Sequence, residues 1–466
     1  MKVALVRTWY KTHIITPPLG MGYLAAYLKK FNHDTVIIDG LNDNLSHEQI
    51  IDKCKEFGAK LVGIYCLSAF FLDTAELVKK LNKNGIKTIM GGAHPSFLPQ
   101  YTIERVPIDF IIVGEAEQTV TELATALENH QPTDNIPGVY TKQTKNTTPG
   151  KVIENLDEIP FPDWKQIDPR KYSKAPHGGF IRHFPCAPIT TTRGCPYRCT
   201  FCASPKFSKR TLRKRSAKNV VDEIEYLVNN FGIKEFHFED DNFTFYRQHA
   251  ITVCQEIINR GLKISWASPN GIRADKLDPE LAQLMKKSGC YYVNFGIESG
   301  NQTILNNIKK DTTLEQLRNG IKIADDAGIM TQGSFIFGLP GETEQTIQES
   351  IEFAKSLPLT RAQFLNLDVM PGTELWDTLD FEEKVNWNQT SYHDVTWTPD
   401  TVSKEILEKA PARAFWAFYL RPKQFFTMIK YIKPSQGYYL FKRMWDCKIL
   451  PGKILFDKLI TKKANT

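Results

Sequence analysis

Three closely spaced cysteines are the residues of this sequence whose type and spacing point most directly to chemistry. Cys195, Cys199 and Cys202 form a CxxxCxxC pattern. Three thiolates at this spacing can bind three irons of one cubic cluster, which leaves the fourth iron without a protein ligand. A cluster held by four cysteines mainly carries electrons, whereas an open iron can bind a substrate or a cofactor. The pattern therefore predicts a catalytic [4Fe-4S] cluster.

A zinc site or a disulfide explains these cysteines less well. Structural zinc takes four ligands, usually as two separated pairs. A disulfide needs an oxidising compartment, and nothing in the sequence indicates one. The remaining cysteines are scattered and form no second CxxC pair: Cys54, Cys66, Cys186, Cys254, Cys290 and Cys447.

Length and composition indicate an ordinary globular protein of two or three domains. The chain has 466 residues, of which 42% are hydrophobic and 24% are charged, values typical of folded domains. No apolar run is long enough to span a membrane, and the first seven residues are too short and too soon interrupted for a secretory signal. We expect a cytoplasmic protein, which suits an oxygen-sensitive cluster.

The positive charge is concentrated in the last part of the chain. The formal net charge is +7, yet residues 421–466 alone contain 11 Lys or Arg and only 2 Asp or Glu, mixed with aromatic residues. No nucleic-acid partner is therefore expected elsewhere. Residues 411–466 are predicted to form short helices, broken by Pro434 and Pro451. They either cap the second domain with their charges in water, or contact the inner face of a membrane peripherally.

Residues 1–130 alternate continuous apolar strands with helices, the pattern of an α/β, doubly wound, Rossmann-like parallel sheet. The strands are predicted at 2–7, 35–39, 61–66, 87–90 and 109–113. No GxGxxG follows the first strand, so a dinucleotide site is not expected. Ligands of such sheets bind beyond the carboxyl ends of the strands, where these candidates gather: Leu19, Gly20, Ser68, Gly91, Gly92, His94, Gly114 and Glu115.

The rest of the chain divides into a proline-rich linker, residues 131–187, and a second α/β region, residues 188–410. In that region we predict strands at 188–192, 234–239, 264–267, 291–296, 331–337 and 362–368, with helices between them. Six strand–helix units make a partial (β/α)6 barrel, whose chemistry should lie at the carboxyl ends of the strands. The candidates there are Glu239, Asp240, Ser268, Asn270, Arg273, Glu298, Gly333, Ile336 and Gly338.

The cysteine region resembles the radical S-adenosylmethionine (SAM) superfamily. The matching residues are Ile189-Thr190-Thr191-Thr192-Arg193-Gly194, followed by CxxxCxxC with Phe201 before the last cysteine. The resemblance implies that the open iron chelates SAM and that one electron cleaves it, giving a 5′-deoxyadenosyl radical. It also implies that the barrel candidates contact SAM, and that an external donor such as a flavodoxin or ferredoxin supplies the electron.

The first domain is similar to the cobalamin-binding domain that precedes many such cores. The runs that carry the likeness are PPLGMGYLAAYL, GGAHPSFLP and GEAEQTVTEL. The resemblance implies that the candidates of residues 1–130 hold cobalamin. No DxHxxG motif is present, so we expect cobalamin without a protein histidine on cobalt. His94 is interpreted either as a packed residue or as a neighbour of the corrin.

Over about residues 1–410 the chain resembles a cobalamin-dependent radical SAM enzyme. The implied reaction is methylation of an unactivated carbon in a small-molecule or lipid substrate. A radical oxidative cyclase or rearrangement enzyme is the alternative, and a non-catalytic cobalamin or iron–sulfur sensor is an alternative of another class. A methylthiotransferase is less consistent, because the first domain lacks its own set of three cysteines.

Overall fold

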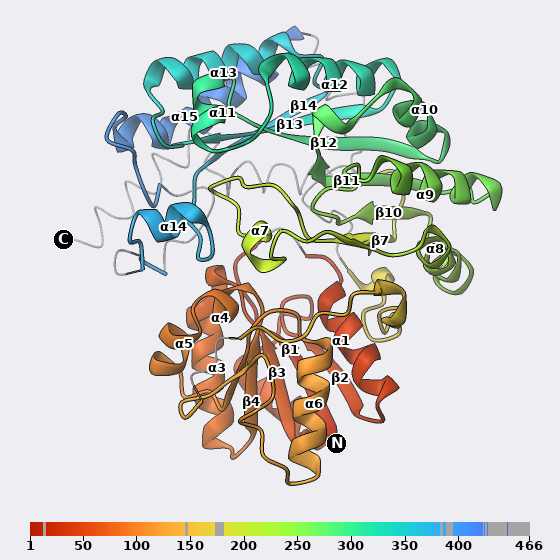
Figure 1. Ribbon diagram of the computed structural model, residues 1–466, viewed down its shortest axis with the longest axis vertical. Coiled ribbons are helices and arrows are strands. Elements are labelled where there is room, and N and C mark those ends of the chain that lie inside the picture. Colours follow the sequence, from red (N-terminus) through yellow and green to blue (C-terminus); the bar gives the residue numbers. More distant parts are fainter. Residues whose placement is uncertain are drawn as a thin grey trace. The chain divides into compact units, whose positions relative to one another are not determined.

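The computed structural model describes most of the chain. Residues 13–14, 145–147, 173–180, 383–384 and 388–394 fall outside the description, as do all residues from 423 on except 424, 426 and 445. The chain forms two compact units (Figure 1). Unit 1 comprises residues 1–172, 213–215 and 370–390, and unit 2 comprises residues 173–212, 216–369 and 391–466.

Unit 1 is built on one six-stranded sheet. The strand order is β2-β1-β3-β4-β5-β6, in which the first five strands are parallel and β6 is antiparallel to β5. This confirms the predicted doubly wound sheet. The strands are β1 Lys2–Arg7, β2 Asp34–Asp39, β3 Leu61–Tyr65, β4 Lys87–Gly91, β5 Phe110–Ile112 and β6 Val139–Tyr140; β9, Arg213–Lys214, also belongs to unit 1.

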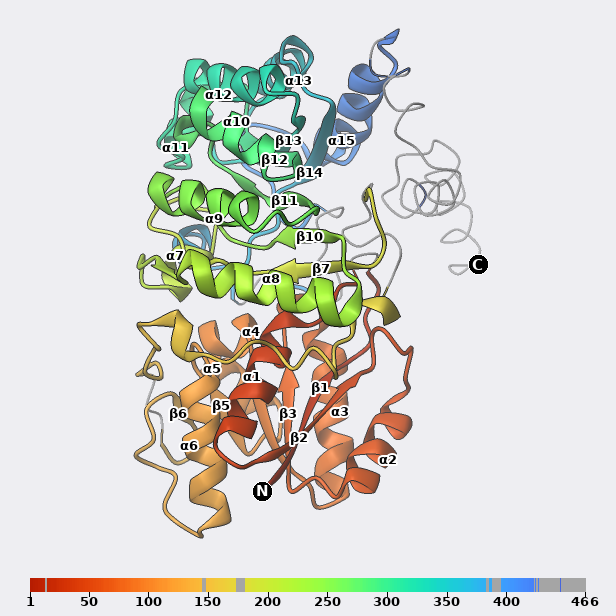
Figure 2. The same cartoon turned by 90° about the vertical axis from the view of Figure 1, so that its right-hand side faces the viewer.

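Helices cover both faces of this sheet (Figure 2). They enclose two apolar cores, one centred on Ile64 and the other on Leu5. Local sequence sets the helix ends: Ser46 caps α2, and its hydroxyl accepts a bond from the Gln49 amide. The helices are α1 Leu19–Lys30, α2 His47–Phe57, α3 Phe71–Lys83, α4 Ala93–Phe97, α5 Pro99–Arg105, α6 Glu117–Glu128 and α14 Glu374–Thr378, with short 3₁₀ turns η1 Ser68–Phe70, η2 Leu156–Glu158 and η3 Pro169–Lys171.

Part of the predicted linker belongs to unit 1. Residues 131–172 cluster with the first sheet, and Tyr172 donates a hydrogen bond of 2.9 Å to the carboxylate of Asp39. Arg7 donates two further bonds to that carboxylate, 2.8 and 2.6 Å long. Because both charged groups are buried, the attraction between them offsets the cost of removing each from water.

Unit 2 is a curved parallel sheet with the strand order β14-β13-β12-β11-β10-β7. Six strands in sequential order, joined through helices, confirm the partial (β/α)6 barrel. The strands are β7 Cys186–Ile189, β10 Glu235–Phe238, β11 Ser265–Ile272, β12 Cys290–Glu298, β13 Met330–Phe337 and β14 Arg361–Asn366, together with the short strand β8, Thr192–Arg193.

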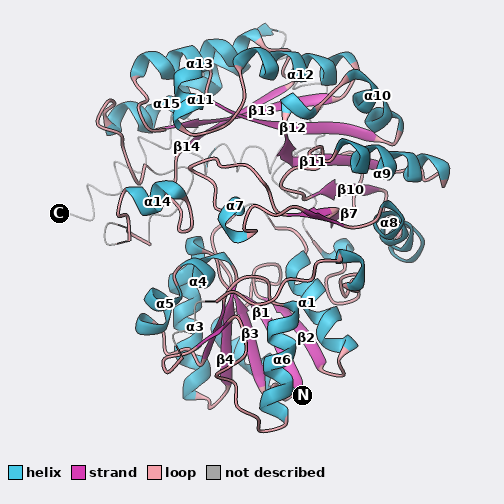
Figure 3. Cartoon of the chain, viewed as in Figure 1, coloured by secondary structure: helices cyan, strands magenta, loops and turns pink. Residues whose placement is uncertain are grey.

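Most helices of unit 2 line the outer side of the curved sheet, whereas the short α7 lies apart from them (Figure 3). The helices of this unit are α7 Ser204–Phe207, α8 Ala217–Phe231, α9 Arg247–Asn259, α10 Pro279–Lys287, α11 Gln302–Asn307, α12 Leu314–Asp326, α13 Glu344–Ser356 and α15 Lys404–Tyr419, with the 3₁₀ turn η5 Ala274–Lys276. The predicted segment 411–466 begins within α15, and nearly all of it after Pro422 lies outside the described residues.

A buried acid closes the glycine-rich turn after β13. Glu342 is fully buried, and its carboxylate accepts hydrogen bonds from the amides of Gly338 and Leu339. Gly338 has φ +89°, a conformation that favours glycine. Burial raises the pKa of Glu342 to about 8, although the two amide bonds act in the opposite direction.

We predict that Glu342→Gln flattens the pH dependence of stability. The raised pKa means that the folded chain keeps a proton which the unfolded chain loses above pH 4.5, so stability falls as pH rises from about 4.5 to about 8. The wild-type chain should lose about 1–2 kcal/mol relative to the variant between pH 6 and pH 8. Urea midpoints at both pH values measure this. Glu344→Gln, at an exposed neighbour, should leave the slope unchanged, and equal slopes for Glu342→Gln and wild type would contradict the assignment.

Candidate active site

The three cysteines lie on a single loop between β8 and α7. All three side chains are partly exposed. The loop begins at Gly194, which has φ +100°, and a Cβ there would lie 2.2 Å from the carbonyl oxygen of Thr211. The Cys195 amide then donates to the Ser208 hydroxyl at 3.4 Å. Only glycine fits this entry to the loop, so the turn fixes where the first cysteine stands.

The thiols are close enough to affect one another. Burial raises the pKa of Cys195 and Cys199, and it raises that of Cys202 to about 12. In Cys202 the charges of the other two cysteines act in the same direction. Binding of a metal deprotonates such thiols and relieves the repulsion. Three converging thiols fit a [4Fe-4S] cluster with one open iron.

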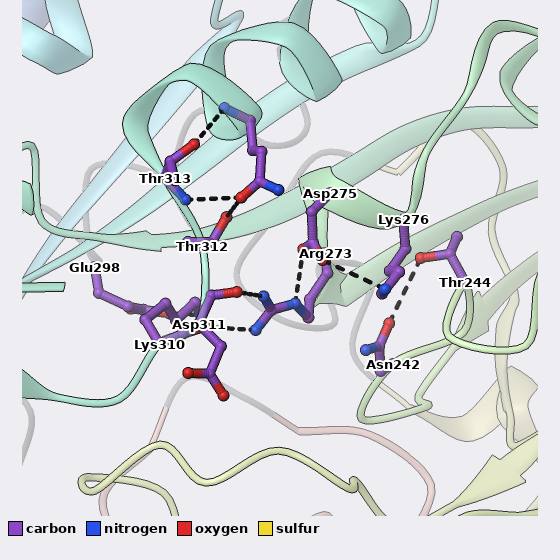
Figure 4. A network of polar contacts seen from close by, with 11 residues as sticks. Asn242, Thr244, Arg273, Asp275, Lys276, Glu298, Lys310, Asp311, Thr312 and Thr313 are labelled. Atoms are coloured by element: carbon purple, nitrogen blue, oxygen red, sulfur yellow. Dashed lines mark hydrogen bonds and ion pairs between the residues drawn. The ribbon is translucent and has the colours of Figure 1, made fainter. Parts of the chain in front are cut away.

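Arg273 links the cysteine loop to the segment after α11, and Figure 4 shows its bonds to that segment. Its guanidinium lies 3.8 Å from the ring centre of Tyr197 in the cysteine loop. It also donates to the carbonyl oxygens of Lys310 and Asp311, at 2.7 and 2.5 Å, and to the Asp275 carboxylate at 2.7 Å. Three of the five N–H groups of Arg273 are thus bonded within the protein, which gives Arg273 a positioning role, and its predicted contact with SAM stays a prediction.

Lys310 and Glu298 form a buried ion pair beside the cysteines. The Lys310 ammonium donates to the Glu298 carboxylate at 2.6 Å, and both side chains are about nine-tenths buried. Burial alone would lower the pKa of Lys310, but the negative charges of Glu298 and of the Cys199 thiolate outweigh it, so the pKa is raised. A cation is thus held against the cluster loop.

Two backbone features make room for the Lys310–Glu298 pair: the positive φ of Glu298 and the absence of a side chain at Gly296. Glu298 has φ +66°, unusual for a residue with a side chain, and the register between β12 and β13 shifts between Gly296 and Glu298. A Cβ at Gly296 would lie 2.5 Å from the Glu298 carboxylate and 3.0 Å from the Lys310 ammonium. The sequence predicted Glu298 as a SAM contact but missed Lys310, because a lysine in a polar loop carries no distinctive signal.

The adjacent acids after β10 have different surroundings. Asp240 is fully buried and accepts bonds from the Thr191 amide at 2.6 Å, the Thr191 hydroxyl at 2.5 Å and the Thr192 amide at 3.0 Å. It therefore anchors the strand that leads into the cysteine loop, and the predicted contact with SAM would require it to exchange these bonds. Glu239 is partly exposed, and its carbonyl oxygen accepts a bond from the exposed amide of Asn270 at 3.0 Å.

Two other predicted SAM contacts, Ser268 and Gly333, lie in packed surroundings, and both contacts stay predictions. Ser268 is fully buried, and its hydroxyl has no hydrogen-bond partner among the described residues. A Cβ at Gly333 would lie 2.6 Å from Ile297 and 2.9 Å from Leu359, so this glycine serves packing on the helix side of the sheet. Ile336 is partly exposed on the opposite side of β13, where the predicted contact with a base is geometrically open.

The amino ends of β7 and β10 hold a second cluster of ionisable groups. Ligand-type atoms of Cys186, Glu235 and His237 lie within 4.8 Å of one another. Two backbone amides, those of residues 182 and 183, donate to the Glu235 carboxylate, as does the hydroxyl of Tyr291. Burial raises the pKa of Cys186, and the charge of Glu235 adds to it. These contacts anchor the chain that enters β7, at the end of the barrel opposite to the cysteine loop.

In unit 1, glycines leave the backbone uncovered near the carboxyl ends of the central strands. A Cβ at Gly20 would have no neighbour within 4 Å, and one at Gly91 would meet only Ile112, at 3.9 Å. Gly92 and Gly114 have φ +112° and +91°. Leu19 opens α1 beside Gly20. Open space over glycine backbone fits a large planar ligand such as cobalamin.

His94 is enclosed within unit 1. Its side chain is only 1% exposed, and its ring stacks on Phe71 at 4.1 Å and meets the edge of Trp387 at 4.8 Å. Ser68 lies 3.1 Å from its Nδ1. Burial lowers the pKa of His94 to about 3. The structure thus supports the interpretation of His94 as a packed residue, and the hydroxyl of Ser68 is engaged with it.

Glu115 is also engaged within unit 1. Its carboxylate accepts a charge-assisted bond from Arg213, which also donates to the Ile153 carbonyl at 2.7 Å. The neighbouring Gly114 amide donates to the Ser96 hydroxyl at 3.1 Å. This loop therefore offers backbone rather than a free carboxylate to a ligand.

Comparison with known proteins agrees with this geometry. Residues 189–354 match the model of the radical SAM superfamily, and residues 11–124 match that of the B12 binding domain. An uncharacterized methyltransferase of Pyrococcus horikoshii is 35% identical over 433 residues, 91% of each chain. Cytidylyl-2-hydroxyethylphosphonate methyltransferase of Streptomyces wedmorensis is 32% identical over 416 residues, 77% of each chain.

A cyclase is also similar to the chain in sequence, and a solved methyltransferase structure is similar to it in fold. Anaerobic magnesium-protoporphyrin IX monomethyl ester cyclase of Rubrivivax gelatinosus is 30% identical over 407 residues, 84% of this chain and 72% of that one. In fold, the chain is similar to the radical SAM methyltransferase TsrM of Kitasatospora setae, solved with cobalamin and a [4Fe-4S] cluster. The TM-score is 0.69 at 20% identity, with 94% of this chain and 92% of that one covered.

The fold and the site therefore define a radical SAM enzyme. Within that superfamily, the chain belongs to the members that carry a B12 binding domain, and it is methyltransferase-like. Its cofactors are a [4Fe-4S] cluster, SAM and cobalamin.

We predict that Lys310→Met lowers cleavage of SAM by about tenfold to a hundredfold. The change leaves the Glu298 carboxylate buried without its cation and removes the positive charge beside Cys199. Formation of 5′-deoxyadenosine under dithionite reduction measures the effect, and iron content shows whether the cluster is retained. Lys309→Met, at the exposed neighbour, is the matched control. An unchanged rate in Lys310→Met would show that the pair is only structural.

Proposed function

We propose that this protein is a radical SAM C-methyltransferase that transfers a methyl group to an unactivated carbon. The observation that carries the proposal is the loop of three converging thiols at the carboxyl ends of the barrel strands, in a chain that also has a cobalamin-binding unit. With their cofactors bound, the two units supply a 5′-deoxyadenosyl radical, which removes hydrogen from the substrate, and a methyl group for the resulting carbon radical.

The chain's own residues position the SAM molecule and exclude water. Glu239 and Glu298 are the carboxylates that we assign to the ammonium group of SAM, and Lys310 is the cation for its carboxylate. Asn270 is assigned to the ribose, and Ile336 with the backbone at Gly338 is assigned to adenine. Arg273 and Asp240 hold the loops from which these groups project.

A radical oxidative cyclase is the second candidate. The 30% identity to the anaerobic cyclase over 84% of this chain favours it. Both reactions begin with removal of a hydrogen from carbon, and they differ in what the carbon radical does next. The greater identity to two methyltransferases supports methyl transfer as the first choice.

We further propose that an external one-electron donor, such as a flavodoxin or ferredoxin, reduces the cluster, and that the substrate is a small molecule or a lipid. In the part of the chain that the structure describes, no helix is long and apolar enough to cross a membrane. The predicted peripheral membrane contact falls on residues 421–466, which lie almost entirely outside that part.

The stoichiometry of SAM consumption tests the proposal. A methylase of this kind uses SAM both as radical source and as methyl donor. We predict that each methylated product is accompanied by about one 5′-deoxyadenosine and one S-adenosylhomocysteine. Anaerobic turnover of the reconstituted enzyme, followed by chromatography and mass spectrometry, measures both.

The same assay separates the rival reaction. Product that forms with 5′-deoxyadenosine but without S-adenosylhomocysteine would contradict methyl transfer and favour the cyclase. The variant in which Cys195, Cys199 and Cys202 are all alanine is the control, since it should form neither 5′-deoxyadenosine nor methylated product.

A further inference from the structure

The two faces of the barrel sheet carry different kinds of side chain. Successive residues of a strand point to opposite faces, and the register between β12, β13 and β14 aligns each set. The helix-side face is apolar and buried, with Val293, Phe295, Phe335, Phe337, Ala362 and Phe364. The inner face, turned away from the helices (Figure 3), carries the polar or partly polar residues Tyr292, Asn294, Gln332, Ser334, Arg361 and Gln363, with the apolar Met330, Ile336 and Leu365 among them.

Four of these inner-face residues form a connected network, which we call the polar wall: Asn294, Gln332, Ser334 and Gln363. Ser334 donates to the Asn294 amide oxygen at 3.0 Å. The Gln332 amide nitrogen lies 3.4 Å from the same oxygen and 3.4 Å from the Gln363 amide oxygen. Asn294 is anchored in turn, since its nitrogen donates to the carbonyl oxygen of Pro269 at 3.2 Å.

Some donors and acceptors of the polar wall are not paired with other described residues. The two bonds of Gln332 are at the long limit and therefore weak. Among the described residues, the Gln332 amide oxygen and the Gln363 amide nitrogen have no protein partner. If either amide is turned over, an acceptor and a donor still remain on this face. Ser334 and Gln363 are only partly buried, whereas the helix-side residues beside them are buried.

The composition of this face does not suit a packed barrel interior. Closed barrels fill their interior with branched aliphatic side chains. An interior lined with amides whose donors and acceptors are unpaired costs free energy unless a ligand binds them. The polar wall also lies next to the SAM residues in sequence. Ser334 precedes Ile336 by two positions on the same face of β13, and Asn294 precedes Glu298 by four on β12.

We propose that the polar wall binds the substrate, and that the substrate presents adjacent hydrogen-bond donors and acceptors, such as neighbouring hydroxyl groups or an amide, beside the carbon that loses hydrogen. This deepens the proposed function and rests on it. A hydrocarbon placed here would leave the amides of Gln332 and Gln363 desolvated and unpaired. Of the small-molecule and lipid substrates, the inner face thus favours the polar small molecule.

The test uses the full chain, reconstituted with cluster and cobalamin. Its probes are two extracts of cells that lack the gene, one in aqueous methanol and one in chloroform. The rate of 5′-deoxyadenosine formation above the extract-free rate reports substrate engagement, and S-adenosylhomocysteine reports methyl transfer. The variants are Gln332→Leu and Gln363→Leu, close in volume to the wild type, and Ser334→Ala, which removes one hydroxyl. Gln345→Leu, exposed on α13, is the matched control.

We expect the aqueous extract to stimulate 5′-deoxyadenosine formation. Each leucine variant should reduce that stimulation by about tenfold or more, because it removes a bonding group that the substrate needs. Stimulation is expressed relative to the extract-free rate of each variant, iron content shows whether the cluster and its barrel are retained, and Gln345→Leu should behave as wild type.

Three results would overturn the proposal: stimulation by the chloroform extract alone, no stimulation by the aqueous extract, or wild-type stimulation in both leucine variants. Stimulation by the aqueous extract without S-adenosylhomocysteine would overturn the proposed methyl transfer instead, and would leave the polar substrate in place. The two failures are therefore distinguishable.

Discussion

Burial of three thiols within eight residues is the constraint on which the active site depends. Burial opposes ionisation of Cys195, Cys199 and Cys202, and in Cys195 and Cys202 the charges of neighbouring cysteines add to it. A cluster requires the ionised form. Two cations with fixed positions favour this ionised form. Lys310 is held by Glu298, and Arg273 lies against Tyr197 in the loop. The loop between residues 308 and 313 is therefore as much a part of the site as the cysteines.

The order of elements could be predicted from the sequence because both sheets are parallel. Strands buried on both faces read as continuous apolar runs, and helices between them read by their periodicity. The strands agree with the predicted positions within a few residues, except that β11 extends to Ile272. Contacts between segments that lie far apart in the sequence could not be predicted. Residues 370–390 join unit 1, where Trp387 donates to Tyr101 at 2.7 Å, because such a contact depends on three-dimensional packing and leaves no local pattern.

The candidate site was predictable where spacing carries the information and unpredictable where orientation does. The spacing CxxxCxxC predicts the cluster residues from the sequence alone. The neighbours Glu239 and Asp240 have the same chemistry, yet one is partly exposed and the other is buried under Thr191, a difference set by which way each side chain points. The sequence indicated that Arg273 is important, but two of its partners are backbone oxygens, which no residue pattern specifies. Lys310 reaches the site through a loop with positive φ at Lys309 and Asp311.

We propose that Cys195, Cys199 and Cys202 alone hold a catalytic cluster with an open iron. The most direct measurement is iron content together with 5′-deoxyadenosine formation in the variant with these three cysteines replaced by alanine. A second triple variant, with Cys186, Cys254 and Cys290 replaced by serine, is the comparison. We predict loss of the iron and of all SAM cleavage in the first variant, and retention of a four-iron cluster in the second. A full cluster in the first variant, or its loss only in the second, would contradict this assignment.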